Sequence, residues 1–244
     1  MNHDTDQNST DYVAAITKAA LGMVPLVGSL LSELAGTIIP KQRIDRISDL
    51  AKKLEHKLGV LDEGLVRAKL TDENFTDLFE ETVRHAASAV TEERREYLAS
   101  LLATGVSEEK VSFIETKHLL RILGQINDIE VIWLRFYYFP FMSGDDHFRR
   151  KHAGTIEPVV ATLGCDEATI DKQALQRNYV QHLISLGVLE RPLMTDSKTG
   201  LPIFDPHERT WKTRSHQVTP LGKLLLRYIG LSKLEEDDDL QPLP

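Results

Sequence analysis

Residues 171–186 most restrict how this chain can fold, because they form one helical pattern with defined ends. Asp171 suits the position that caps a helix start, and Gly187 suits the left-handed conformation that ends a helix. Polar side chains occupy the face that is expected to point outward. Apolar side chains recur at helical spacing on the face expected to point inward, at Leu175, Tyr179, Leu183 and Leu186.

Two short strands and a second helix are expected after this helix. Residues 188–189 are expected to pair with residues 217–218 across a long polar loop, and Thr219 followed by Pro220 is typical of a helix start. The order of helix, strand, long loop, strand and helix is that of a winged helix. The sequence therefore predicts a winged-helix-like domain with a small β-hairpin over residues 111–232.

The N-terminal half is expected to be a helical bundle over residues 12–110, so the predicted fold class is mainly α. An apolar seam with alternating steps of three and four begins at Ile44. Gly59 and Gly64 interrupt it, so one helix and two helices that meet near Gly59 fit the sequence equally well. The seam could pair with a second copy of the chain, but the amphipathic neighbouring helices favour packing within one chain. Residues 1–11 are expected to be disordered, and residues 233–244 form an acidic tail. The seam consists of Ile44, Ile47, Ala51, Leu54, Leu58, Leu61, Leu65 and Ala68.

Residues 12–39 form an apolar segment that contains several glycines. Its uncharged run is shorter than the ~20 residues that a membrane-spanning helix needs, and Pro25 would bend it. Gly28, Ser32 and Gly36 lie four residues apart, a spacing that lets another backbone approach closely. These three are candidate residues for helix packing or self-association. A bent, buried helix or a hairpin of two short helices suits the segment best, with membrane insertion or docking and ordering on a partner as alternatives.

Composition narrows the environment of the chain. The net charge of -8 opposes nonspecific binding to nucleic acid, although residues 111–233 carry more Lys and Arg than Asp and Glu. The single cysteine, Cys165, excludes a disulfide scaffold and a thiolate metal cluster. No secretory signal pattern is present, so we expect a cytoplasmic protein, and the apolar segment leaves a peripheral position at the inner membrane open.

No catalytic signature is present, because the patterns of phosphate-binding glycine loops, zinc proteases and serine hydrolases are all missing. We therefore expect a protein that is not an enzyme, with no catalytic residues, no metal, no cofactor and no small-molecule substrate. His118 falls on an apolar stripe and is expected to be a hydrogen-bonded core residue. Asp145, Asp146 and His147 are expected to form a solvated turn, because too few other ligands are nearby to complete a metal site.

Two groups of polar side chains are candidate contacts to DNA or to a protein partner. Those on the 171–186 helix belong to the residue types that hydrogen-bond base edges, and those in the following loop can neutralise phosphates. Acidic residues in the loop offset much of this positive charge, which favours a protein-interaction role. The candidates are Arg177, Asn178 and Gln181 on the helix and Arg209, Lys212 and Arg214 in the loop.

Four short segments together resemble those of one known family. They are Glu96-Tyr-Leu-Ala-Ser-Leu-Leu-Ala-Thr-Gly105, Val111-Ser-Phe-Ile-Glu-Thr-Lys-His-Leu-Leu-Arg-Ile-Leu123, Leu183-Ile-Ser-Leu-Gly-Val-Leu189 and Val218-Thr-Pro-Leu-Gly-Lys223. In this order, after an apolar glycine-containing segment and a charged helix, they are similar to the Abi-alpha family of bacterial proteins, although Thr104 stands where the family has asparagine. The resemblance implies a role in abortive phage infection. It implies no catalytic residues.

We therefore expect a non-enzymatic antiviral defence protein that acts by helix-mediated self-association or by binding a protein partner, with membrane association left open. The alternative is a winged-helix transcription regulator that binds DNA and uses the N-terminal bundle to dimerise or to sense a signal. A contiguous basic face that includes Arg177 and the loop would favour DNA, whereas an acidic or apolar face would favour protein contacts.

Overall fold

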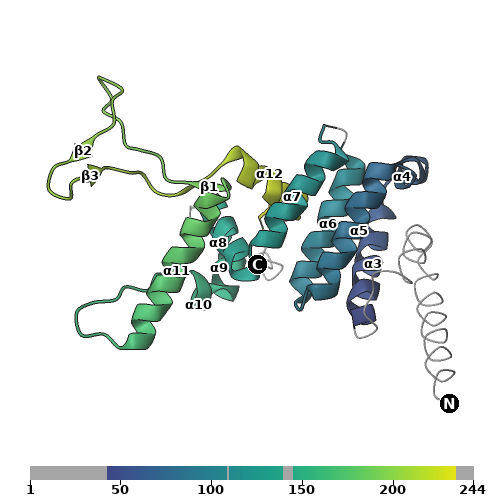
Figure 1. Cartoon of the computed structure of the whole chain (residues 1–244), viewed down its shortest axis with the longest axis horizontal. Helices are drawn as coiled ribbons and strands as arrows, with labels where there is room; N and C mark the ends of the chain where they lie inside the picture. The colour runs from purple at the N-terminus through teal and green to yellow at the C-terminus, as the bar shows by residue number, and fades with distance from the viewer. Residues whose placement is uncertain (1–42, 109, 140–144, 235–244) are drawn as a thin grey trace, which may run out of the picture. The chain divides into compact units, whose positions relative to one another are not determined.

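A computed structural model describes residues 43–108, 110–139 and 145–234. These residues form ten helices and short two-stranded pairings, so the prediction of a mainly α chain with a small β-hairpin is confirmed (Figure 1). The predicted disordered start, the apolar segment over residues 12–39 and nearly all of the acidic tail lie outside the described residues.

The chain divides into two compact units. The first contains the residues up to Gly124 together with Tyr228–Gly230, and the second contains Gln125–Arg227 and the residues from Leu231 onward. The sequence places a boundary after residue 110, whereas the contacts within the chain group the helix over 113–125 with the first unit.

The first unit consists of α3 (Ile44–Leu58), α4 (Glu63–Leu70), α5 (Glu73–Ser88), α6 (Glu92–Ser107) and α7 (Phe113–Gln125). Four of these helices start at a side chain that accepts a backbone N–H of the first turn, and at α7 this side chain is Ser112. Asp62 accepts from Leu65, Asp72 caps α5 in the same way, and Thr91 caps α6. The short polar side chains in the sequence thus decide where the helices begin.

The core of the first unit forms where α3 packs against α5 and α6. The predicted apolar seam is buried within one chain from Ile47 to Leu58, and α3 ends before Gly59, so the structure has the two-helix alternative. The seam prediction fails further on, because Leu65 is half-buried and Ala68 is exposed on α4. Fully buried side chains in this core include Leu50, Leu54, Leu58, Phe75, Leu78, Phe79, Val83, Leu98, Leu101 and Leu102.

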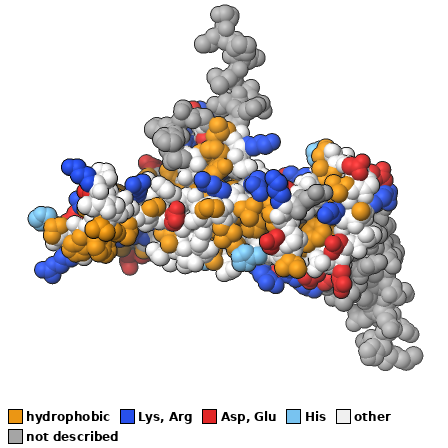
Figure 2. All heavy atoms as spheres, turned by 90° about the horizontal axis from the view of Figure 1, so that it is seen from above, with side chains coloured by type: hydrophobic (Ala, Val, Ile, Leu, Met, Phe, Trp, Pro, Cys, Tyr) orange, Lys and Arg blue, Asp and Glu red, His pale blue; other side chains and the backbone are white. Residues whose placement is uncertain are grey.

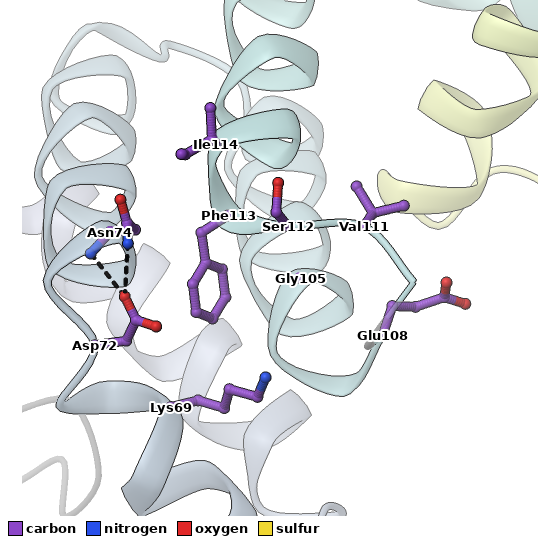
Figure 3. A pocket seen from close by; sticks show the side chains of 9 residues that line it. All are labelled: Lys69, Asp72, Asn74, Gly105, Glu108, Val111, Ser112, Phe113 and Ile114. Carbon is purple, nitrogen blue, oxygen red and sulfur yellow. Dashed lines mark hydrogen bonds between the residues drawn. The ribbon is translucent and has the colours of Figure 1, made fainter.

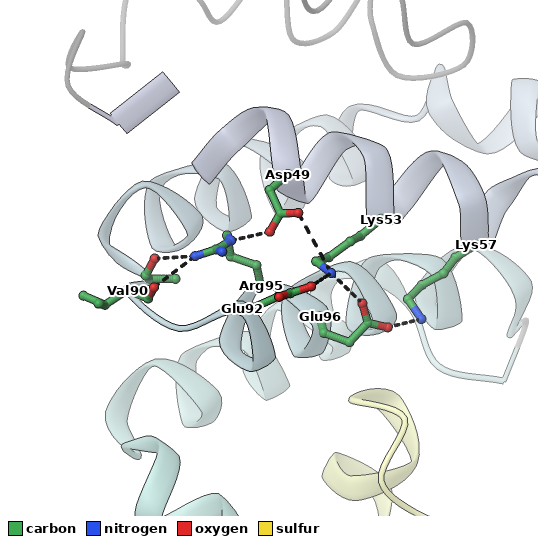
Figure 4. A network of polar contacts seen from close by, with 8 residues as sticks. Asp49, Lys53, Lys57, Val90, Glu92, Arg95 and Glu96 are labelled. Atoms are coloured by element: carbon green, nitrogen blue, oxygen red, sulfur yellow. Dashed lines mark hydrogen bonds and ion pairs between the residues drawn. The ribbon is translucent and has the colours of Figure 1, made fainter. Parts of the chain in front are cut away.

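A row of ion pairs joins α3 to α6 at the edge of this core (Figure 4). Lys53 lies 2.9 Å from Glu92 and 3.6 Å from Glu96, and Lys57 lies 2.6 Å from Glu96. Arg95 pairs with Asp49 on α3 in the same row. Partly exposed pairs of this kind each contribute only about 0.2–1 kcal/mol, so they fix the register of the two helices more than they stabilise them.

The second unit contains α8 (Asp128–Tyr138), α9 (Asp146–Lys151), α10 (Ala153–Ile156), α11 (Glu167–Ser185) and α12 (Pro220–Tyr228). The strand β1 (Leu189–Glu190) pairs antiparallel with β4 (Gln217–Val218), and β2 (Phe204–Asp205) pairs with β3 (Thr210–Trp211). The β1–β4 pairing, in which Leu189 faces Val218, is the one expected from the sequence.

The turn from α11 into β1 and the start of α12 also follow the prediction. Gly187 has φ +71°, a left-handed conformation that favours glycine. Pro220 occupies the first position of α12, and the hydroxyl of Thr219 accepts from the backbone N–H of Gly222. Gly222 has a further role, because a Cβ atom there would collide with the carbonyl oxygen of Val188. The glycine therefore lets α12 pack closely on the backbone before β1.

A buried ion pair joins α8 to the start of α9. Nη2 of Arg135 lies 2.9 Å from Oδ1 of Asp145, and both side chains are 2% exposed. The guanidinium also lies over the ring of Phe148, 4.3 Å from its centroid. The predicted solvated turn is therefore wrong for Asp145, although Asp146 and His147 are exposed as expected. Sequence spacing alone did not reveal that Arg135 points at this carboxylate from the preceding helix.

We predict that Asp145→Ala destabilises the second unit by about 3–5 kcal/mol, because it leaves the buried charge of Arg135 without its carboxylate. Both tryptophans of the chain, Trp133 and Trp211, lie in this unit, so tryptophan fluorescence during urea unfolding reports on it. Asp146→Ala removes an exposed neighbouring carboxylate and should change the unfolding free energy by less than about 1 kcal/mol. Equal effects of the two substitutions would contradict this assignment.

Candidate functional site

The segment between β1 and β4 folds into an extended arm, which we define as residues 191–216 (Figure 1). Its stretch around Met194 hydrogen-bonds to both strands of the β2–β3 hairpin. The backbone N–H of Met194 donates to Lys212, and its carbonyl accepts from Ile203. Lys212 in turn donates to Ile203, so three short stretches of chain hold one another. The arm is thus an ordered element that satisfies its own backbone.

Two aspartates shape the turns of the arm. Oδ1 of Asp196 accepts from the backbone N–H groups of Lys198 and Thr199, and Asp205 accepts from His207 and Glu208 in the same way. These hydrogen bonds lower the pKa of both carboxyl groups. The two acids whose charge was expected to offset the cations of the loop therefore also have a structural role in its turns.

Large apolar side chains are exposed on the arm. Figure 2 shows hydrophobic side chains gathered on one face of the arm, with Lys and Arg side chains near them. Phe204 and Trp211 face each other across the hairpin, with ring centroids 5.2 Å apart, yet each remains nearly half exposed. A contiguous apolar patch is typical of an interaction surface. Its members are Leu193, Met194, Leu201, Phe204 and Trp211, which are 39–65% exposed.

The three predicted contact residues of the loop all lie on this arm. Arg209 has φ +52° and follows the turn that Asp205 shapes, and Arg214 is exposed. Lys212 lies 3.6 Å from the carboxylate of Asp205, which reduces the charge it can offer to a partner. The structure thus brings Arg209, Lys212 and Arg214 together on one element.

A groove of about 670 Å³ lies between α8 and α11 in the same unit, and we call it the α8–α11 groove. Aromatic side chains of α8 form one wall, and polar and apolar side chains of α11 form the other. Both ends of the arm, Arg191 and His216, complete it. The lining residues are Trp133, Phe136, Tyr137, Pro158, Val159, Gln173, Gln176, Arg177, Val180, Gln181, Ile184, Arg191 and His216.

Hydrogen bonds from glutamine side chains hold the segment that closes one end of the groove. Oε1 of Gln176 accepts from the backbone N–H of Val159 at 2.9 Å, while Nε2 donates to the carbonyl of Glu157. Nε2 of Gln173 donates to the carbonyl of Val159. The two glutamine side chains thus provide hydrogen-bond partners for backbone groups of Glu157 and Val159, which belong to no helix or strand. This part of the groove wall is therefore fixed in position.

The groove is aromatic and electropositive. Trp133 stacks on Tyr137 with ring centroids 5.8 Å apart, and Tyr137 lies 5.2 Å from the ring of His216. Burial raises the pKa of Tyr137. Burial and, second, the positive charge of Arg191 lower the pKa of His216. Arg177 is the second arginine of the lining, and none of the lining residues is Asp or Glu.

The predicted inward face of α11 is wrong in its N-terminal half. The helix begins at Glu167 after the cap Asp166, not at Asp171, and Leu175 is 54% exposed. Only Leu183 is fully buried on α11. The face turned toward α8 carries Gln173 and Gln176 instead, because their amides satisfy the backbone of the neighbouring segment. Hydrogen bonds of these glutamines thus orient α11 about its axis, and the spacing of the apolar residues predicted a different orientation.

The three candidate contact residues on α11 therefore do not lie on one face of the helix. Arg177 and Gln181 line the groove, whereas Asn178 is exposed and does not line it. His182, which was expected to point outward, instead pairs with the buried carboxylate of Glu130 on α8, with 2.6 Å between Nδ1 and Oε1. The predicted set therefore does not form one contact surface.

A smaller hollow of about 230 Å³ lies in the first unit beside Phe113 (Figure 3). Lys69 lies over the ring of Phe113, with 5.6 Å between Nζ and the centroid. The carboxylate of Asp72 accepts from the backbone and side chain of Asn74, and Ser112 bonds to Glu115. Since these polar groups already satisfy one another, the hollow has little to offer a ligand.

The other sequence-predicted features lie apart from these sites. His118 is exposed on α7, so its prediction as a core residue is wrong. Within the described residues, no three His, Cys, Asp or Glu side chains are grouped so that they could hold a metal ion. None of the helices described is long and apolar enough to cross a membrane. Gly28, Ser32 and Gly36 lie outside the described residues, so their association role stays a prediction.

Comparison with known proteins adds no relative. No protein-family model matches the chain, and neither the curated proteins nor the solved structures contain a significant match. The resemblance to the Abi-alpha family thus stays a prediction that rests on the four short segments.

The sequence analysis did not predict the groove, although the aromatic residues of one wall follow a recognisable pattern. Trp133, Phe136 and Tyr137 follow one another at steps of three and one, which puts three aromatic rings on one side of α8. Trp133 is buried, whereas Phe136 and Tyr137 are only half-buried. The contribution of Arg191 and His216 depends on the β1–β4 pairing that brings the two ends of the arm together.

We predict that the stability of the second unit falls as the pH decreases from about 7.5 through 6.5. The folded protein keeps His216 deprotonated at pH values where the unfolded chain, with a histidine pKa near 6.5, already binds a proton, so acid favours unfolding. His216→Gln should reduce this dependence in urea unfolding monitored by tryptophan fluorescence. Direct titration by NMR should give His216 a pKa below 6.5, and Arg191→Gln should raise it. A pKa at or above 6.5 in the unaltered chain would contradict the prediction.

Proposed function

We propose that the second unit is a winged-helix-like module in which the arm is an enlarged wing. Support comes from the chain order, in which α8, the short helices α9 and α10, and α11 precede the β1–β4 pair. The arm connects the two strands of that pair, at the place where a winged helix has its wing. α12 then packs on the backbone before β1 through Gly222.

The function that this module supports best is binding to a protein partner, without catalysis. The apolar patch on the arm carries the proposal. Phe204, Trp211 and Leu201 remain exposed on an element that is already held by backbone hydrogen bonds among its own stretches, so a partner could bury them without refolding the arm. Binding to a preformed surface avoids the entropy of ordering a loop. Aromatic side chains at the centre of a patch are the residue type that dominates binding energy at interfaces.

Self-association through helices receives less support than contact through the arm. The apolar face of α3 is already covered by α5 and α6 within one chain. The remaining candidates for helix-mediated association, Gly28, Ser32 and Gly36, have no described environment. We therefore assign the contact to the arm, with either a second copy or a different protein as the partner. The biological setting that we propose is bacterial phage defence in the cytoplasm, as the Abi-alpha resemblance implies.

We predict that a photo-crosslinking residue, p-benzoylphenylalanine, captures protein when it replaces Phe204 or Trp211 in bacterial cells. Both positions lie in the centre of the patch and are nearly half exposed. Adducts should be visible by gel electrophoresis and mass spectrometry and should disappear with protease but not with nuclease. An adduct of twice the chain mass would identify a second copy as the partner, and any other protein mass would identify a different one.

The matched control places the same crosslinker at Val60, which is 80% exposed in the first unit and lies outside the arm. It should give no protein adduct. In cells challenged with phage, Phe204→Ser combined with Trp211→Ser should increase plaque formation, whereas Val60→Ser should not. Absence of adducts at both arm positions, or adducts equal to those at Val60, would refute binding through the arm.

Binding to DNA is the second candidate, because the cations Lys198, Arg209 and Arg214 are exposed on the same arm. Cations on a wing can contact phosphates, and three to four such contacts would weaken binding by roughly a hundredfold between 50 and 200 mM salt. The poor supply of cations on α11 disfavours this function.

We therefore predict weak duplex binding that is the same for unrelated sequences. Fluorescence anisotropy at the two salt concentrations measures it, and Lys212→Glu with Arg214→Glu should change it little. Tight binding at 50 mM salt that falls steeply at 200 mM and disappears in the charge-reversed variant would support DNA binding instead.

A further inference from the structure

The α8–α11 groove combines positive charge with flat aromatic walls, and neither property is needed for the partner contact of the arm. We propose that this groove binds a small anion that carries a planar ring. An aromatic carboxylate and a nucleoside monophosphate share this chemistry. The proposal adds a small-molecule ligand to a chain whose sequence predicts none, and it stands whether or not the arm binds protein.

The charge of the lining favours an anion. Arg177 extends from α11, and Arg191 follows β1. Neither arginine has a carboxylate partner in the described parts of the chain, and no Asp or Glu lines the groove. Arg191 also lies close enough to Tyr137 and His216 for its charge to act on both. A guanidinium beside a partly buried wall can hold a carboxylate or phosphate through paired N–H groups.

The rings of the lining favour a planar group on that anion. Trp133 stacks on Tyr137 with ring centroids 5.8 Å apart, and the ring of His216 lies tilted by 54° against Tyr137 at 5.2 Å. Phe136 meets Trp133 edge-on at 5.6 Å. Trp133 is buried, whereas the other three rings are only partly covered, so they present apolar area to the groove. A flat ring would cover that area by stacking, as nucleobases do on exposed aromatic side chains.

The groove has a suitable size and a fixed shape. Its volume of about 670 Å³ lies in the range of roughly 300–1,000 Å³ that is typical of small-molecule sites. One wall is positioned by the His182–Glu130 pair between α11 and α8, and the end segment is positioned by Gln176. The amide of Gln181 has no partner in the described residues and is exposed at the edge, where it can hydrogen-bond a ring substituent. The site is therefore formed before a ligand enters.

The test uses the full chain with Trp211→Phe, so that Trp133 is its single source of tryptophan fluorescence. Benzoate and AMP are the anionic probes, benzamide and adenosine are their neutral counterparts, and inorganic phosphate is the anion without a ring. At least one anionic probe should quench Trp133 saturably, with a dissociation constant about fivefold or more below that of its neutral counterpart and of phosphate. The tighter of benzoate and AMP identifies the source of the ligand.

Matched arginine variants locate the anion. Arg191→Gln should remove most of the preference for the anionic probe, whereas Arg209→Gln, which removes an exposed arginine of the arm that does not line the groove, should leave it unchanged. Equal affinity for anionic and neutral probes, saturation by phosphate alone, or equal losses in the two variants would each overturn the proposal.

A second readout does not depend on fluorescence. A bound anion opposes the charge of Arg191 and should raise the pKa of His216, measured by NMR titration in the presence of saturating benzoate or AMP. The neutral counterparts should not raise it. An unchanged His216 pKa with a saturating anion would place the ligand elsewhere and overturn the assignment.

Discussion

The buried carboxylate of Glu130 is the interaction on which the second unit depends most. Oε2 accepts the backbone N–H of Asn127 and completes the capping box at the start of α8, while Oε1 pairs with His182 on α11. One side chain, 4% exposed, thus caps the start of α8 and joins that helix to α11. Because a buried carboxylate must have partners, this pair restricts how α11 can rotate against α8. The Glu130–His182 pair therefore also sets the distance between α8 and α11, which form the two walls of the groove.

The groove and the arm meet at two residues. Arg191 begins the arm and His216 ends it, and both line the groove. The β1–β4 pair holds these ends together, so the arm projects from a closed base. A ligand in the groove would touch both ends of the element that we assign to partner binding. Any change in the position of Arg191 on ligand binding would therefore act directly on the base of the arm, without a long path through the protein.

Local sequence signals predicted the ends of elements well and their burial less well. Gly187 and Pro220 each act through their own backbone or the next turn, and both behave as expected. Leu175 failed because the burial of a side chain depends on what packs over it, and here the neighbouring segment needed glutamine amides. The Arg135–Asp145 pair and the groove depend on the same kind of tertiary information.

Exposed apolar side chains are distributed unevenly, and this separates the roles of the two units. The described part of the first unit exposes Val60, Val90 and Ile114, which are far apart in sequence, and its helices are otherwise joined by a full core and a row of ion pairs. In the second unit, most of the large apolar side chains that are exposed lie on the arm or around the N-terminal half of α11. A domain selected only for stability would bury such groups, since each buried Leu or Phe contributes about 1.5–3 kcal/mol. The exposed apolar area of the second unit therefore supports the proposed contact with a partner.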